Sequence, residues 1–430
     1  MKIFINPPKN TWAEILRRPV FNVIELENQV QSVLTEIKSG GIKALRKYTE
    51  QFDGVSILNF SVQEQEIEDA ISLVEDSLKK AIEIAAGNIR TFHESQVSSV
   101  KKIETTPGVV CWQKSVGIEK VGLYIPGGSA PLFSTVLMLA IPAKIAGCKE
   151  IILCTPPNKE GKIHPAILYA AQLVGITQIF KIGGVQAIGA MAVGVDYIPK
   201  VHKIFGPGNQ YVMAAKQIVS RGDVAIDMPA GPSEVAVMAD HSAIPAFIAS
   251  DLLSQAEHGP DSQVVLVTNS SDLVVKVQDE IEKQLALLPR KSIAEKALAN
   301  SHAVVLDQVS DMIDLVNEYA PEHLIIAMEN YVQVAEEIIN AGSVFLGNYT
   351  PESAGDYASG TNHTLPTNGW ARSFSGVNID SFIRKITFQE ISPEGIINLG
   401  PVIEIMAAAE ELNAHKNAIS LRLEELKNKK

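Results

Sequence analysis

The chain has 430 residues and 46% hydrophobic content, enough for more than one core, and its length favours roughly two to three domains. A net charge of −12 and a pI near 5.3 give an acidic surface that repels nucleic acid, so we expect no nucleic-acid partner. No run approaches signal-peptide or membrane-span length, and three cysteines suggest a reducing compartment, so we expect a cytoplasmic protein without membrane contact.

The first hundred residues are predicted to be mainly helical, since apolar residues recur at helical spacing between 67 and 89. From about residue 105 the pattern changes to strands that alternate with helices. The expected strands are 121–126, 151–155, 178–182 and 203–205, and the expected helices are 133–146, 164–173, 187–193 and 210–219. Glycine-rich turns end several of these strands, at 127–131, 183–184 and 206–208.

A second alternating series begins near residue 233. Its expected strands are 235–238, 263–268, 303–306, 323–327 and 343–346, and its expected helices are 244–256, one through about 288, 309–319 and 332–339. Continuous apolar strands between helices are typical of parallel sheets that are covered on both faces. We therefore predict an α/β fold with two open, mostly parallel Rossmann-like sheets and helical extensions at both termini. Ligands in such folds bind at the carboxyl ends of the strands.

The chain is predicted to divide into four parts. Residues 1–22 form an N-terminal arm, and 23–120 with 235–375 form a first α/β domain. Residues 121–234 form a second α/β domain that contains the glycine-rich turns. Residues 376–430 form a helical tail, whose amphipathic part at 403–426 suits contact with a partner subunit.

Residues 347–372 interrupt the pattern as a long stretch without secondary-structure signals. Loops of this length in compact domains are usually functional or disordered, and the aromatic and apolar residues here argue against disorder. The stretch contains Asp356 and His363, which makes it a candidate part of a functional site.

Pro321-Glu322-His323 stands at the entry to an apolar run. Adjacent side chains on a strand point to opposite faces, so Glu322 and His323 can serve one site only at a strand end or in a turn, which Pro321 favours. Glu322 could activate a water and His323 could move protons near neutral pH. The alternative is a surface Glu-His pair at a helix-to-strand junction.

Gln255 and His258 share one face at the end of the helix predicted from 244, which Gly259 and Pro260 stop. Together they are a plausible metal half-site, although His258 could instead cap the helix. Asp356 and His415 would complete a set of imidazole and carboxylate donors of the kind that zinc prefers. The alternatives are a turn residue for Asp356 and a polar position on a partly exposed helix for His415.

The glycine turns contain no G-x-G-x-x-G, so the standard dinucleotide fingerprint is absent. Backbone N–H groups at the turns Gly127-Gly128 and Gly206-Pro-Gly208 can still hold a pyrophosphate, although tight turns that need positive φ explain the same glycines. Cys148 and Cys154 lie in or beside an apolar strand, where cysteines are usually inert packing residues and not nucleophiles.

Several longer motifs occur in a set order along the chain. They are Val-Gly-Leu-Tyr124-Ile-Pro-Gly-Gly-Ser-Ala-Pro-Leu, Gly-Gly-Val-Gln186-Ala-Ile, Phe-Gly-Pro-Gly-Asn209, Asp-Met-Pro-Ala-Gly-Pro-Ser233-Glu, Leu-Ser-Gln255-Ala-Glu-His258-Gly, Ala-Pro-Glu322-His323-Leu, Thr-Asn-His363-Thr-Leu-Pro and Glu410-Glu-Leu-Asn-Ala-His415. In this order the chain resembles the histidinol dehydrogenase family over nearly its whole length. The resemblance implies a zinc-dependent homodimer that oxidises L-histidinol to L-histidine through histidinaldehyde and reduces two NAD⁺, in histidine biosynthesis.

The resemblance also implies roles for individual residues. The implied zinc ligands are Gln255, His258, Asp356 and His415, and zinc would orient the substrate through its amine and imidazole. Glu322 and His323 match the acid/base pair: His323 would take the alcohol proton and assist the second hydride transfer, and Glu322 would activate water on the aldehyde. The substrate-binding positions are these six residues with Ser233, His363 and Glu410, and the positions that contact NAD are Tyr124, Gln186 and Asn209.

In the family's dimer the C-terminal helices reach the other subunit, so Glu410 and His415 are expected to complete the neighbour's site. Glu411 places two adjacent acids before His415, which leaves open which acid meets the substrate. Three rivals remain: a related NAD-dependent dehydrogenase that acts on another hydroxyl substrate, a zinc hydrolase with Glu322 as base, and a non-catalytic metal-binding scaffold.

Overall fold

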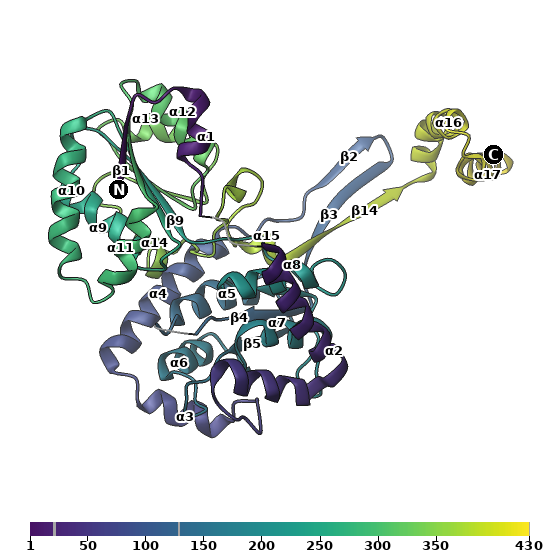
Figure 1. The fold of residues 1–430 in the computed structure, drawn as a ribbon. Helices are drawn as coiled ribbons and strands as arrows, with labels where there is room; N and C mark the ends of the chain where they lie inside the picture. The colour runs from purple at the N-terminus through teal and green to yellow at the C-terminus, as the bar shows by residue number, and fades with distance from the viewer. Residues whose placement is uncertain (20–22, 128–129, 430) are drawn as a thin grey trace. The chain divides into compact units, whose positions relative to one another are not determined.

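The computed structural model describes residues 1–19, 23–127 and 130–429 (Figure 1). The chain divides into two compact units. The first comprises Met1–Gln96 and Ile118–Ser381, and the second comprises Val97–Gly117 and Phe382–Lys430. Among the described residues, no helix is both long and apolar enough to cross a membrane.

The first unit contains two parallel sheets. One has the strand order β1-β11-β10-β9-β12-β13 and the other β6-β5-β4-β7-β8. The strands are β1 Lys2–Ile5, β4 Lys120–Tyr124, β5 Glu150–Thr155, β6 Gln178–Lys181, β7 Lys203–Phe205, β8 Ala225–Ile226, β9 Glu234–Ala239, β10 Gln263–Thr268, β11 His302–Val305, β12 His323–Ala327 and β13 Ser343–Leu346. In each series the first strand is central, the next two follow on one side and the last two on the other. This strand order is typical of Rossmann-like folds, and it confirms the predicted α/β class with two parallel sheets.

Helices cover both faces of the sheets. They are α1 Trp12–Ile15, α2 Val23–Asp53, α3 Glu64–Ser72, α4 Asp76–Glu94, α5 Phe133–Ile145, α6 Pro165–Leu173, α7 Gly184–Val193, α8 Gln210–Val219, α9 Pro245–Ala256, α10 Ser271–Leu285, α11 Lys291–Ala299, α12 Val309–Tyr319, α13 Tyr331–Glu336 and α14 Glu352–Tyr357, with the short α15 Ile379–Phe382, η1 Lys9–Thr11 and η2 Trp370–Arg372. Figure 1 shows α9, α10 and α11 on one side of the β9 sheet and α1, α12 and α13 on the other.

Alternate residues of β9 explain why its sequence is a continuous apolar run. Val235 and Val237 pack into the core beneath α9 and α10, while Ala236 and Met238 pack into the core beneath α1 and α12. Because both faces of the strand are buried, no polar residue interrupts it.

The helices of residues 23–94 pack differently from the predicted domain organisation, which joined them to the β9 sheet. Val30, Ile37 and Leu45 of α2 share one core with Ile152 of β5 and Ile188 of α7. The close approach of α2 and α7 depends on glycine, because a Cβ on Gly189 would lie 3.1 Å from Ile37 Cδ1. The predicted boundaries at 22, 120, 234 and 375 stay a prediction.

The second unit contains a strand that the sequence prediction of a helical tail missed. β14 Ile383–Ile391 pairs antiparallel with β3 Val109–Gly117, which also pairs with β2 Lys102–Thr106. The helices α16 Pro393–Ala409 and α17 Asn413–Asn428 follow. No local signal indicates β14, because its partner strand lies far earlier in the chain and its side chains are mostly exposed.

Candidate active site

Glu322 and His323 lie at the amino end of β12, in the geometry that the sequence requires of two adjacent functional side chains. His323 is the first residue of the strand and is paired with Val235 of β9. Glu322 is 7% exposed and His323 4% exposed, so the alternative of a surface pair is wrong. Both groups therefore depend on polar partners within the protein.

The backbone of Glu234 holds both side chains. Its N–H donates to Glu322 Oε2 at 3.0 Å, and its carbonyl oxygen lies 3.3 Å from His323 Nδ1. With Nδ1–H donated to that carbonyl, the imidazole points Nε2 at Asp356 Oδ1, 3.5 Å away, an ion-pair separation for a protonated His323. Gln255 Nε2 donates to the same Glu322 oxygen at 3.3 Å.

Electrostatics in this pocket favour positive charge. Burial raises the pKa of Glu322 to about 8, although His323 opposes the change. Burial alone would lower the pKa of His323, but the carboxylates of Glu352, Glu322 and Asp356 outweigh it and raise that pKa to about 10. The chain by itself thus surrounds one imidazole with more carboxylates than it can neutralise.

Two helices bring candidate metal ligands together. Gln255 lies in the last turn of α9 and His258 just beyond it, while Asp356 lies on α14. Ligand atoms of His258, Asp356 and Glu352 all lie within 4.8 Å of one another. Among the described residues, Gln255 Oε1 and both carboxylate oxygens of Glu352 are buried without a hydrogen-bond partner. A nitrogen and oxygen donor set of this kind, with orphaned acceptors, fits a divalent cation such as zinc.

Glu352 was not recognised from the sequence, because residues 347–372 were interpreted as a stretch without secondary structure. That interpretation is wrong in part: α14 occupies 352–357, so Asp356 is a helical residue and not a turn residue. Gly355 lets this helix approach β13, since a Cβ there would lie 2.7 Å from Phe345 Cε1. The spacing of Glu352 and Asp356, four residues apart as on one helix face, was the available signal.

Ser233 and His363 border the same region. Ser233 directly precedes β9 and is half-buried. His363 Nδ1 lies 2.9 Å from the Asp356 carbonyl oxygen, and its Nε2 lies 3.0 Å from Thr135 Oγ1 on α5. His363 is therefore tied both to the helix that carries Asp356 and to a helix of the β4 sheet.

The sequence also contains no indication of an ion pair that lies next to Glu322 and His323. Arg18 pairs with Glu234 and donates a further hydrogen bond to the Tyr319 carbonyl oxygen at 2.7 Å. Glu234 is the residue whose backbone holds Glu322 and His323. The N-terminal arm thus anchors the first residue of β9, a long-range contact without any local sequence pattern.

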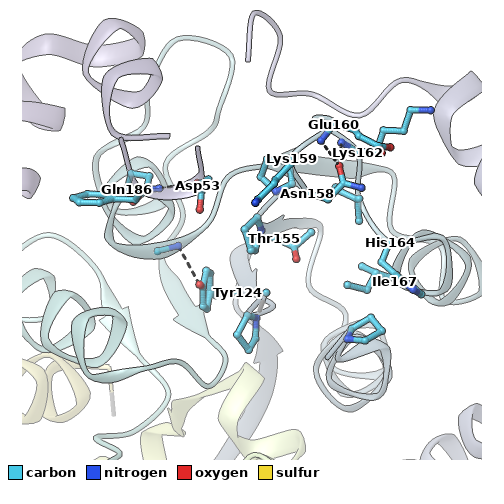
Figure 2. A pocket seen from close by; sticks show the side chains of 18 of the residues that line it. Asp53, Tyr124, Thr155, Asn158, Lys159, Glu160, Lys162, His164, Ile167 and Gln186 are labelled. Carbon is cyan, nitrogen blue, oxygen red and sulfur yellow. Dashed lines mark hydrogen bonds between the residues drawn. The ribbon is translucent and has the colours of Figure 1, made fainter. Parts of the chain in front are cut away.

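The other three predicted positions line a cavity of about 1220 Å³ at the carboxyl ends of β4, β6 and β7 (Figure 2). Tyr124 Oη accepts a hydrogen bond from the Gly184 N–H at 3.0 Å, and Gln186 Nε2 donates to Asp53 Oδ2 at 3.0 Å. Asn209 Oδ1 caps α8 by accepting from the N–H groups of Tyr211 and Val212, each at 3.1 Å.

Glycine is required where these turns meet. A Cβ on Gly206, whose φ is +127°, would lie 2.1 Å from the Tyr124 carbonyl oxygen, and one on Gly127 would lie 2.1 Å from Pro156 Cγ. Gly128, part of the predicted 127–131 turn, lies outside the described residues. Close packing of the turns on Tyr124 and Pro156 therefore explains these two glycines.

The expectation that ligands bind at the carboxyl ends of the strands applies to this cavity but is wrong for Glu322 and His323. They lie at the amino end of the β9 sheet. The reason is that α9 runs antiparallel to the strands that it connects, so its last turn carries Gln255 and His258 to the amino end. A pattern along the chain shows the helix but not the edge of the sheet that its end reaches.

The remaining predicted site residues belong to the second unit. Glu410 follows α16, and His415 lies in the first turn of α17; both are exposed, and Glu411 between them adopts a positive φ of 61°. Elsewhere, the interpretation of Cys148 and Cys154 as packing residues agrees with their burial, which raises the pKa of both thiols, that of Cys148 to about 11.

Comparison with known proteins gives consistent matches. Residues 16–423 match the family model described as histidinol dehydrogenase. A histidinol dehydrogenase from Bacteroides thetaiotaomicron is 61% identical over 99% of this chain and 100% of its own length, and one from Escherichia coli is 50% identical over 96% and 95%. The crystal structure of histidinol dehydrogenase from Elizabethkingia anophelis is 57% identical, covers 99% of both chains and superposes with a TM-score of 0.97.

Proposed function

The chain belongs to the histidinol dehydrogenase family, and on that premise we propose how its residues oxidise L-histidinol to L-histidine with NAD. The reaction belongs to histidine biosynthesis. Two successive oxidations, of the alcohol and then of the aldehyde, transfer two hydrides, so each turnover reduces two NAD⁺.

The observation that supports the proposal best is the buried Glu322–His323 pair at the start of β12. With its Nδ1–H held at the Glu234 carbonyl, His323 offers Nε2 to the substrate hydroxyl and takes the proton as hydride leaves. Glu322 then activates a water that attacks the aldehyde. His323 assists the second hydride transfer from the resulting hydrate. Two different steps at one site explain why both a carboxylate and an imidazole are present.

Gln255, His258, Asp356 and His415 are proposed to hold a zinc ion. When bound, zinc would position the substrate through its amine and imidazole nitrogens. The orphaned Gln255 Oε1 and the proximity of His258 to Asp356 support this ligand set. Ser233, His363 and Glu410 are proposed to bind the remaining polar groups of the substrate.

The cavity bordered by Tyr124, Gln186 and Asn209 is proposed to hold NAD. Its size suits a dinucleotide, and Lys159 and Lys162 line it as sources of positive charge for the phosphates. Figure 2 shows the Gln186–Asp53 pair on one side of the cavity and the segment of 158–162 on the other, with Tyr124 below them in this view.

We further propose a homodimer in which the partner's His415 and the partner's Glu410 complete each site. Apolar side chains on α16 support an interface there, because Val402, Ile405 and Met406 are at least half-exposed in the single chain. The low cysteine count supports a reducing compartment such as the cytoplasm.

The test is absorbance at the NADH band with purified protein, NAD⁺ and L-histidinol, with and without a chelator. We expect two NADH per histidinol, loss of the signal on chelation and its return with zinc. No NADH from a folded, metal-loaded protein would favour a related dehydrogenase with another substrate. Turnover without NAD⁺ would favour the hydrolase, and bound metal with no turnover on any substrate would favour the scaffold.

A further inference from the structure

Glu352 faces the same point in space as two of the proposed zinc ligands. It begins α14, four residues before Asp356, so both carboxylates project from one side of the helix. One ligand atom each from Glu352, Asp356 and His258 lies within 4.8 Å of the other two. Two ligands that are each about 2.1 Å from zinc stand at most about 4.2 Å apart. The three donors, within 4.8 Å of one another, would reach this separation by a small side-chain rotation, so they can bind one ion.

Glu352 is also the most enclosed member of this group. Its side chain is buried, with the residue 1% exposed, yet neither carboxylate oxygen has a hydrogen-bond partner among the described residues. Its backbone N–H donates to the Asp251 carboxylate on α9. A buried, unpaired carboxylate is costly, so a positively charged partner from outside the chain would be stabilised there.

We propose that Glu352 is a further carboxylate ligand of the divalent cation, beside His258 and Asp356. The inference rests on the proposed zinc site. A second carboxylate brings the negative charge at the ion to two, which matches the charge of the cation. In the substrate-free protein, Glu352 would be a fifth ligand beside Gln255, His258, Asp356 and the partner's His415, a number that zinc accommodates.

The experiment measures cation affinity of the apoprotein, not activity. Glu352→Gln keeps the shape and removes the charge, and Glu336→Gln on α13 removes an exposed carboxylate as the matched control. Zinc affinity is measured by competition with a chromophoric chelator, and coordination by the visible absorption of the Co²⁺-substituted full-length protein. We expect Glu352→Gln to bind zinc at least about tenfold more weakly, with an altered Co²⁺ spectrum, and the control to match wild type.

An unchanged zinc affinity and Co²⁺ spectrum in Glu352→Gln would overturn the inference. So would unchanged affinity with a raised KM for histidinol, which would assign the carboxylate to the substrate ammonium group. If wild type itself binds no zinc, the proposed zinc site fails and the inference fails with it. If wild type binds zinc and Glu352→Gln binds it equally well, only the inference fails. Circular dichroism and melting of the apoproteins report folding. If Glu352→Gln does not fold, zinc affinity is measured for Glu352→Asp, which keeps the charge but has a shorter side chain. Weaker zinc binding would support the inference, and unchanged binding would overturn it.

Discussion

Glu322 and His323 share one electrostatic environment, in which the carboxylates of Glu352 and Asp356 also act on the His323 imidazole. Burial raises the pKa of Glu322 to about 8, and neighbouring carboxylates raise that of His323 to about 10 against the effect of burial, so the chain alone keeps both protonated near neutral pH. A cation held among the same carboxylates would lower both values. The acid/base roles proposed for the pair therefore depend on the metal even if the metal takes no part in proton transfer.

Replacing Glu322 by Gln tests the division of roles between the two residues. Only the aldehyde step needs an activated water, so we expect Glu322→Gln to slow that step by about 100-fold or more while the alcohol step falls by less than about tenfold. Single-turnover measurements of NADH formation from histidinol and from histidinaldehyde separate the two steps. Equal losses in both would remove Glu322 from the role of water activator.

Asp53 provides a pH-dependent prediction at the proposed NAD cavity. Burial raises its pKa from 3.8 to about 6, opposed by the hydrogen bond from Gln186. Because the folded protein disfavours the charged form, wild type loses stability as the pH rises from about 4 to 6 and Asp53→Asn does not. Since the side chain is partly exposed, we expect the variant to be more stable by about 1 kcal/mol above pH 6 and equal below pH 4.

Thermal unfolding of both proteins without NAD, at several pH values between 3.5 and 8, checks this prediction. A stability difference that stays constant across that range would show that the charge of Asp53 is not its cause.

At the level of elements, the site depends on how closely β12 and β13 can run side by side. Gly342 precedes β13 and donates its N–H to the Pro321 carbonyl oxygen at 2.9 Å, and Ser343 N–H donates to the Glu322 carbonyl oxygen, also at 2.9 Å. A Cβ on Gly342 would lie 2.5 Å from that Glu322 carbonyl oxygen. The start of β13 thus holds the backbone of Glu322 and His323.

Gly342→Ala should consequently move Glu322 and His323. We expect a stability loss of about 1–3 kcal/mol and a fall in kcat of about tenfold or more, because small displacements of catalytic groups are costly. Gly87→Ala on α4 is the control, since no described atom lies within 4 Å of its added Cβ and alanine favours a helix. Melting curves and NADH production measure the two effects. Wild-type turnover in Gly342→Ala would mean that the strand start tolerates displacement.

At the level of the whole molecule, the proposal assigns each site to two subunits. Glu322, His323, Gln255, His258 and Asp356 belong to the first unit of one chain, and the partner's Glu410 and the partner's His415 would complete the set. If the second unit serves the partner subunit, then two variants that are each inactive can complement one another in a mixed dimer.

Glu322→Gln and His415→Asn are such a pair. In a mixed dimer one site would carry both substitutions and the other neither, so unfolding and refolding an equal mixture should restore about a quarter of wild-type activity. If each chain completes its own site, every site in the mixture carries one substitution and the activity stays at the level of the separate variants. NADH production before and after mixing distinguishes the two arrangements.

The sequence by itself was sufficient for the fold class, the two parallel sheets, the family and the motif positions. Runs such as Val235–Ala239 bury both faces of a strand, and this leaves a direct pattern in the residues. The tertiary structure alone decided that α2 packs on the β4 sheet, that β14 pairs with β3, and that Glu352 joins His258 and Asp356. It also decided that Arg18 anchors the first residue of β9. The physical reason is that periodicity and capping record contacts between neighbours along the chain, whereas the meeting of distant side chains depends on how helices and strands pack, and that packing leaves no local pattern.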